Sequence, residues 1–204
     1  VEHESGANFT KEVDLRHARF EDSVSTDDAA FTDDGDLRVD LGVAVGLPEG
    51  TTLQATVGVG GTTEDDEVTL TRVDNTSAVV IDRETLDERG LLDNPREVTI
   101  EGSEAYFDGA ATVDVREVAA TETTATRDAG RLVLSNPLFE GGRSYVVDAR
   151  PTNGDAQYLV TVDADGDGAS GLRLNSSALL AASEIEATVE RNGNVLLDTE
   201  RVPI

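Results

Sequence analysis

Residues 37–45 read LRVDLGVAV, an alternation of apolar side chains with polar or small ones. A period of two places the apolar side chains in one row on one face of a β-strand. Turn residues at 46–50 interrupt the pattern, and the same alternation resumes from Leu53 to Val59. The stretch therefore predicts a β-hairpin with one apolar face, which needs a second sheet to cover it.

Short strands of the same kind follow along the chain, about eight to twelve residues apart. We predict them at 68–71, 78–81, 97–100, 105–107, 111–118, 131–134, 144–149, 157–162, 172–174, 185–191 and 195–202. Asn192-Gly193 joins the last two, and Asn-Gly between alternating strands is a strong hairpin signal. This spacing predicts an all-β fold, a β-sandwich of the Ig-like or jelly-roll type with at most one short helix.

The predicted helix spans Asp82 to Leu92. Asp82 can cap its first turn, Glu84 suits the positive end of the helix dipole, and Gly90 is a stop signal.

With 204 residues, the chain can hold one large β domain or two small ones. We expect an N-terminal segment at 1–20 and a β-sandwich domain at 21–204. A Thr- and Ala-rich stretch at 119–130 could be a strand, a long loop or a boundary between two halves.

The charge is strongly acidic: 42 acidic residues face 16 basic ones, for a net charge of −26 and a pI near 4.1. Lys11 is the only lysine. At low salt such a charge opposes folding by self-repulsion, whereas about 1 M salt shortens the Debye length to about 3 Å. The composition resembles that of haloarchaeal proteins. It also argues against nucleic acid and anionic membranes as partners.

The chain has no cysteine, so disulfides and thiolate metal sites are excluded. It begins at Val1, from which we expect either a trimmed initiator methionine or a removed signal segment. No apolar stretch approaches the roughly 20 residues that a membrane-spanning helix needs, so we expect no membrane insertion.

One local motif points to a metal ion: Asp163, Asp165 and Asp167 alternate with small residues and precede Gly168. Carboxylates at positions one, three and five, with a glycine at six, match the first half of a calcium loop. Position twelve is Leu174, where an EF-hand has glutamate, which argues against an EF-hand. A looser calcium loop and an acidic hairpin turn both stay open, and we expect no required cofactor.

Three sequons for N-glycosylation begin at Asn8, Asn75 and Asn175, and they agree with an extracellular location at the cell surface. For catalysis, His3 and His17 are the only histidines, and no nucleophile elbow or phosphate loop occurs. We therefore expect that the protein is not an enzyme.

These features favour an extracellular structural subunit that polymerises with itself into a pilus-like filament or a surface layer. The segment from Asn8 to Phe20 could donate a strand to the sheet edge of a neighbouring subunit, because open edges accept strands. Its assembly face would carry Phe9, Val13, Leu15 and His17.

A sequence likeness points the same way. Phe20-Glu21-Asp22, with the region from Phe31 to Leu41, resembles secreted fibre subunits of the TasA/camelysin type. Two alternatives remain: a tail-tube, capsid or decoration protein of a haloarchaeal virus, and a calcium-stabilised binding module of a surface protein.

Overall fold

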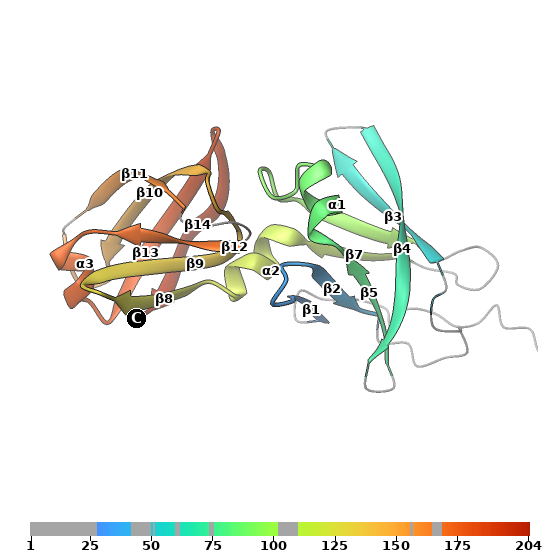
Figure 1. The fold of residues 1–204 in the computed structure, drawn as a ribbon, viewed down its shortest axis with the longest axis horizontal. Helices are drawn as coiled ribbons and strands as arrows, with labels where there is room; N and C mark the ends of the chain where they lie inside the picture. Colours follow the sequence, from blue (N-terminus) through green and yellow to red (C-terminus); the bar gives the residue numbers. More distant parts are fainter. Residues whose placement is uncertain are drawn as a thin grey trace, which may run out of the picture.

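The computed structural model describes residues 28–41, 50, 52–59, 62–73, 76–101, 110–155, 157–164 and 169–204. The described residues form several antiparallel sheets with three short helices, which confirms the all-β, sandwich-like class. Figure 1 shows two lobes side by side along the long axis. We call residues 28–114 the N-terminal lobe and residues 124–204 the C-terminal lobe.

The N-terminal lobe contains a seven-stranded antiparallel sheet. Its spatial order is β1 (Ala29–Phe31), β2 (Leu37–Asp40), β5 (Thr76–Ile81), β4 (Thr62–Val73), β3 (Thr52–Val59), β6 (Glu97–Glu101) and β7 (Ala110–Asp114). The apolar row of the opening motif is buried as predicted, since Leu37, Val39 and Leu41 are inaccessible to solvent.

The predicted hairpin between the two alternating stretches is wrong. Strand β2 pairs with β1 and β5, whereas β3 pairs with β4 and β6, so two strands separate them in the sheet. Alternation fixes which face of a strand is apolar. It leaves the neighbour open, because every backbone offers the same hydrogen-bonding groups to any partner.

The C-terminal lobe is a sandwich of two smaller antiparallel sheets (Figure 1). One has the order β11 (Tyr158–Asp163), β10 (Ser144–Pro151), β13 (Glu184–Arg191) and β14 (Asn194–Pro203). The other has the order β12 (Ala169–Leu174), β9 (Arg131–Glu140) and β8 (Thr124–Asp128). The turn between β13 and β14 has positive φ at Asn192 and Gly193 (53° and 82°), which confirms the predicted Asn-Gly hairpin.

The predicted helix is confirmed as α1 (Arg83–Glu88). The Asp82 carboxylate accepts a hydrogen bond from the Thr85 amide at 2.7 Å, and Gly90 has a φ of 68° just after the helix.

The expectation of at most one short helix is wrong, because two further short helices occur. In α2 (Val115–Thr121) the Asp114 carboxylate accepts from the Arg116 amide at 2.9 Å, so the predicted strand at 111–118 ends at this cap. In α3 (Ser177–Ala181) the capping side chain is Ser176. Both helices need one polar cap and one buried turn, and these local signals are too short to produce a helical period.

The seven-stranded sheet ends at Asp114, and the sandwich strands begin at Thr124. Helix α2 therefore enters the stretch 119–130 that the sequence left open. The expected N-terminal segment at 1–20 lies outside the described residues, so the domain boundaries stay a prediction.

Candidate functional site

The junction between the two lobes is built around helix α2. This helix contacts β1 and β7 of the N-terminal lobe and β9 and β14 of the C-terminal lobe. It buries Val115, Val118 and Ala119 in a hydrophobic core that includes residues from both lobes. Apolar burial of this kind is the main stabilising contribution to packing, so the lobes share part of their folding free energy.

An ion-pair cluster also crosses the junction, and we call it the junction cluster: Arg83 and Asp93 from the N-terminal lobe, Glu140 and Arg191 from the C-terminal lobe. The Arg191 guanidinium lies 3.2 Å from a Glu140 carboxylate oxygen and also pairs with Asp93. The Arg191 and Glu140 side chains are only 7% and 15% exposed. Charges buried this deeply are tolerated only when they are paired, so each depends on its partner.

Tyr145 holds the C-terminal half of the junction cluster in position. Its hydroxyl oxygen accepts a hydrogen bond from the Glu140 amide at 2.7 Å, and its ring lies 5.9 Å from the Arg191 guanidinium and 5.2 Å from the Phe139 ring. Burial raises the pKa of the Tyr145 phenol above its usual range, so the hydroxyl stays neutral. The cation therefore rests between a carboxylate and an aromatic face.

Arg83 belongs to the N-terminal half of the junction cluster. Its guanidinium donates to the Pro137 carbonyl at 2.8 Å and lies 3.9 Å from a Glu140 carboxylate oxygen. Its backbone amide donates to the Asp36 carboxylate at 2.9 Å. A side chain on Gly35 would collide with the Arg83 guanidinium, and Gly35 has a φ of 83°, so glycine is required there for two reasons.

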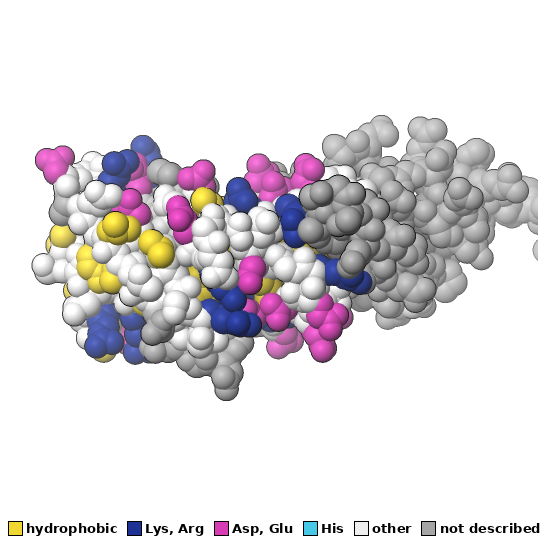
Figure 2. Space-filling model, turned by 90° about the horizontal axis from the view of Figure 1, so that it is seen from above, with side chains coloured by type: hydrophobic (Ala, Val, Ile, Leu, Met, Phe, Trp, Pro, Cys, Tyr) yellow, Lys and Arg dark blue, Asp and Glu magenta, His cyan; other side chains and the backbone are white. Residues whose placement is uncertain are grey.

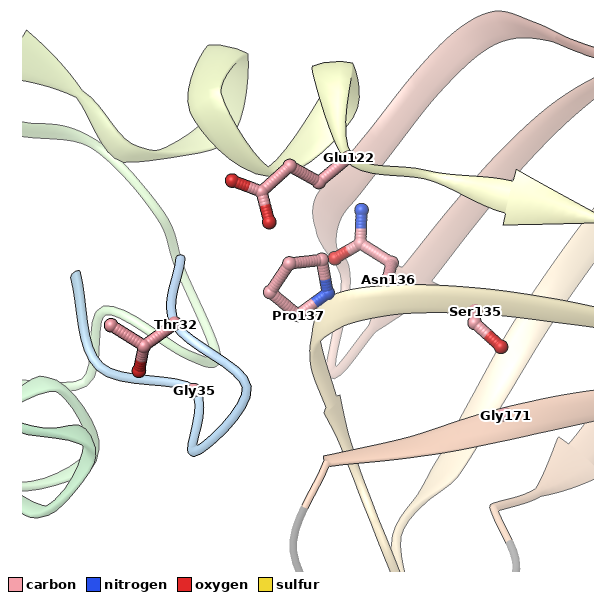
Figure 3. A pocket seen from close by; sticks show the side chains of 7 residues that line it. All are labelled: Thr32, Gly35, Glu122, Ser135, Asn136, Pro137 and Gly171. Atoms are coloured by element: carbon pink, nitrogen blue, oxygen red, sulfur yellow. The ribbon is translucent and has the colours of Figure 1, made fainter. Parts of the chain in front are cut away.

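A pocket of about 270 Å³ opens at the same junction. Figure 3 shows its walls: the turn after β1 on one side, the end of α2 above, and strands β9 and β12 on the other side. It is lined by Thr32, Gly35, Glu122, Ser135, Asn136, Pro137 and Gly171.

Glu122 spans the pocket between the lobes. Its carboxylate accepts a hydrogen bond from the Phe31 amide at 2.6 Å, which ties the end of α2 to strand β1. Burial raises the pKa of Glu122 above its ordinary value of 4.5, and the hydrogen bond from Phe31 partly opposes this. The carboxylate thus has a structural partner already.

Asn136 is buried beside this pocket, with 4% of its surface exposed. Its amide group donates to the Ala119 carbonyl and to the Thr123 hydroxyl, both at 2.9 Å. Its side-chain oxygen accepts from the Leu138 amide at 2.8 Å. Because all these groups are satisfied, Asn136 fastens the end of α2 to strand β9.

The polar side chains at the junction serve to connect elements of the protein to one another. The polar groups of Glu122 and Asn136 already bond to the protein itself. In the part of the chain that the structure describes, no group of three or more His, Asp or Glu side chains is placed to hold a metal ion. Among the described helices, none is long and apolar enough to cross a membrane.

Most of the residues predicted from sequence motifs lie outside the described residues. Asp163 ends strand β11, while Asp165 and Asp167 fall in the undescribed 165–168, so the calcium loop stays a prediction. Phe9, Val13, Leu15 and His17, the predicted assembly face, also fall outside.

Of the three sequons, the structure places only the last. Asn175 is exposed directly after β12, and its backbone amide donates to the Tyr158 hydroxyl at 3.3 Å. Asn8 and Asn75 lie outside the described residues. Glycosylation stays a prediction at all three.

The sequence analysis did not single out the junction residues, although a signal for two of them exists. Arg191 follows Ile185, Ala187 and Val189 in the buried row of β13. Asn136 stands in the same way among the buried leucines of β9. A polar residue in phase with an apolar row must find a buried partner, and that rule would have pointed to both.

Comparisons with known proteins add no assignment. Neither a protein-family model nor the sequence of a curated protein matches this chain.

Proposed function

We propose that this protein is an extracellular structural subunit of a haloarchaeal filament or surface layer, and that it polymerises with itself by strand donation or edge pairing. The junction cluster is the observation that carries the proposal. Lobes of one chain move relative to each other by default unless their interface is large and apolar or otherwise fixed. A subunit that transmits force along a polymer needs two lobes that keep one relative position.

The contacts across the junction meet this need in two independent ways. A shared apolar core resists separation of the lobes, and the buried Arg191–Glu140 pair with Asp93 resists sliding, because a displaced Arg191 would lose its paired carboxylates. Two hydrogen bonds nearby, from the Phe31 amide to Glu122 and from Asn136 to the Ala119 carbonyl, also hold the junction together.

The charge supports assembly in concentrated salt. A net charge of −26 keeps single copies soluble and apart at low ionic strength. Screening at molar salt leaves short-range contacts free to act. Both lobes end in edge strands among the described residues, and open edges are the usual acceptors for an added strand.

The test is assembly of the purified full chain in 2 M KCl, followed by negative-stain imaging. We expect filaments or lattices from the full chain and from a variant lacking residues 1–7, and none from a variant lacking residues 1–20. The shorter deletion is the control, because it leaves the predicted donor segment from Asn8 to Phe20 intact.

Two results would contradict the proposal. Dispersed single particles at every salt concentration would exclude a polymer-forming subunit. Assembly that survives loss of residues 1–20 would exclude strand donation by that segment.

A further inference from the structure

Strand β11 is an edge strand with an unusual surface for so acidic a protein. Among the described residues it has one hydrogen-bonded neighbour in its sheet, β10, and it also contacts β12. From Tyr158 to Val162 it carries no charged residue and no proline. Leu159 is 68% exposed, and Val146 on β10 is 42% exposed. No other large hydrophobic side chain in the described residues is exposed to this degree.

The two exposed side chains belong to one patch on the outer face of the sheet. Val146 pairs with Thr161 and Asp148 pairs with Leu159, so Leu159 and Val146 are diagonal neighbours on the same face. Figure 2 shows hydrophobic side chains gathered on the surface of the C-terminal lobe, between scattered charged ones. Farther along the face the surface is polar, since Arg150 binds Glu186 at 2.8 Å.

The other edge strands of the C-terminal lobe carry features that discourage pairing. Strand β14 includes Asp198, Arg201 and Pro203, and β8 ends in Arg127 and Asp128. Strand β12 has a register shift between Ala169 and Gly171. Charges, proline and bulges are the usual protection of an edge, and β11 lacks them from Tyr158 to Val162.

We propose that β11 pairs antiparallel with β11 of a second copy of this chain, and so extends the four-stranded sheet across a two-fold axis. In such a contact the same strand supplies both sides, and residue i of one copy meets residue j of the other while j meets i. Two copies with a net charge of −26 each repel one another least where the pairing strand is uncharged. The neutral run from Tyr158 to Val162 meets this condition.

The midpoint of the neutral run predicts the register. With Val160 on the two-fold axis, Leu159 of one copy lies opposite Thr161 of the other copy. Thr161 is itself the neighbour of Val146, so Leu159 of one copy and Thr161 and Val146 of the other form one row across the contact. The Leu159 side chains of the two copies are then diagonal neighbours on the same face and can shield one another.

The contact is small compared with a stable dimer interface, which buries about 800 Å² per partner. A single pair of copies therefore associates weakly. In the polymer of the proposed function, on which this step rests, many such contacts act together and join neighbouring filaments laterally.

The chain contains no cysteine, so single cysteines can report the contact. Leu159→Cys and Thr161→Cys proteins are mixed in 2 M KCl and oxidised with copper phenanthroline. We expect the mixed disulfide to form about tenfold faster than the homodimer of Thr126→Cys, because pairing raises the local thiol concentration. Thr126 is the matched control, since it is an exposed threonine on the edge strand β8.

A charge at the contact should abolish it. When the Thr161→Cys protein also carries Leu159→Lys, its disulfide with the Leu159→Cys protein should form no faster than the Thr126→Cys homodimer. Thr126→Lys added to the Thr161→Cys protein should leave the rate of the mixed disulfide unchanged. Equal rates for the reporter pair and Thr126→Cys would overturn the proposal.

The variant lacking residues 1–20 separates this proposal from the proposed function. With the reporter cysteines, it should keep the fast crosslink even if it forms no filaments. Loss of the crosslink with that deletion would mean that the N-terminal segment brings the copies together, and it would overturn a direct pairing of two β11 strands.

Discussion

The Arg191 guanidinium and the Glu140 carboxylate lie 3.2 Å apart, and both side chains are almost fully buried where the two lobes meet. Arg191 ends β13 and Glu140 ends β9, so the pair joins the two sheets of the C-terminal lobe. Asp93 and Arg83 extend it into the N-terminal lobe. One buried guanidinium thus connects the two sheets of the C-terminal lobe to the turn after α1 in the N-terminal lobe.

Replacement of Arg191 by methionine should destabilise the protein strongly. Methionine keeps much of the volume but removes the buried cation that Glu140 and Asp93 share, and breaking a buried pair in this way costs about 3 kcal/mol. Urea unfolding in 2 M KCl measures the loss.

Arg143→Ala is the control for this variant, because Arg143 also lies near Glu140, at 3.6 Å, but is 50% exposed. Its loss should cost below about 1 kcal/mol. Equal effects of the two variants would contradict a special role for the buried cation.

Gly35→Ala should be more costly than Gly130→Ala. Both glycines have positive φ, at 83° and 77°, so each alanine meets the same backbone penalty of about 1 kcal/mol. At Gly35 the added methyl group also displaces the Arg83 guanidinium from the Pro137 carbonyl, while the space around Gly130 is open. Thermal melts of the two variants give the difference, and equal shifts would argue against the close approach.

Asn136→Ala should cost about 2 kcal/mol, because it removes the acceptor of the buried Leu138 amide and one of the donors to the Ala119 carbonyl. Ser135→Ala, one residue earlier on the more accessible face of β9, should have little effect. Amide hydrogen exchange tests the position of the defect: protection should fall at Leu138 before it falls in β13.

The stability of Glu122→Gln relative to the wild-type protein should increase as the pH rises. Burial raises the pKa of Glu122 in the folded protein, so the folded state holds the proton more tightly than the unfolded state does. The resulting stabilisation is complete below 4.5, the ordinary value, and is lost as the pH rises through the raised pKa. Glutamine keeps an oxygen that can accept from the Phe31 amide and has no proton to lose.

Urea unfolding from pH 4 to pH 8 measures this. The unfolding free energy of Glu122→Gln minus that of the wild-type protein should increase with pH and then level off. The exposed Glu88→Gln removes the same charge without burial and serves as control. A flat difference for Glu122→Gln would contradict the raised pKa.

The sequence by itself determined the all-β class, the buried faces of the strands, helix α1 and the turn at Asn192-Gly193. These features depend on side-chain periodicity and on caps or turns within a few residues, so they are present in any short window of the chain. It also determined the charge, and with it the expectation of a salt-rich habitat.

Only the tertiary structure decided that β5 and β4 separate β2 from β3, and that Arg191 meets Glu140 and Asp93 across the junction. The partners of a strand or of a buried charge lie far away in the chain, as Glu140 and Arg191 do. Backbone hydrogen bonds do not distinguish one strand from another, so the choice falls to the packing of the whole core.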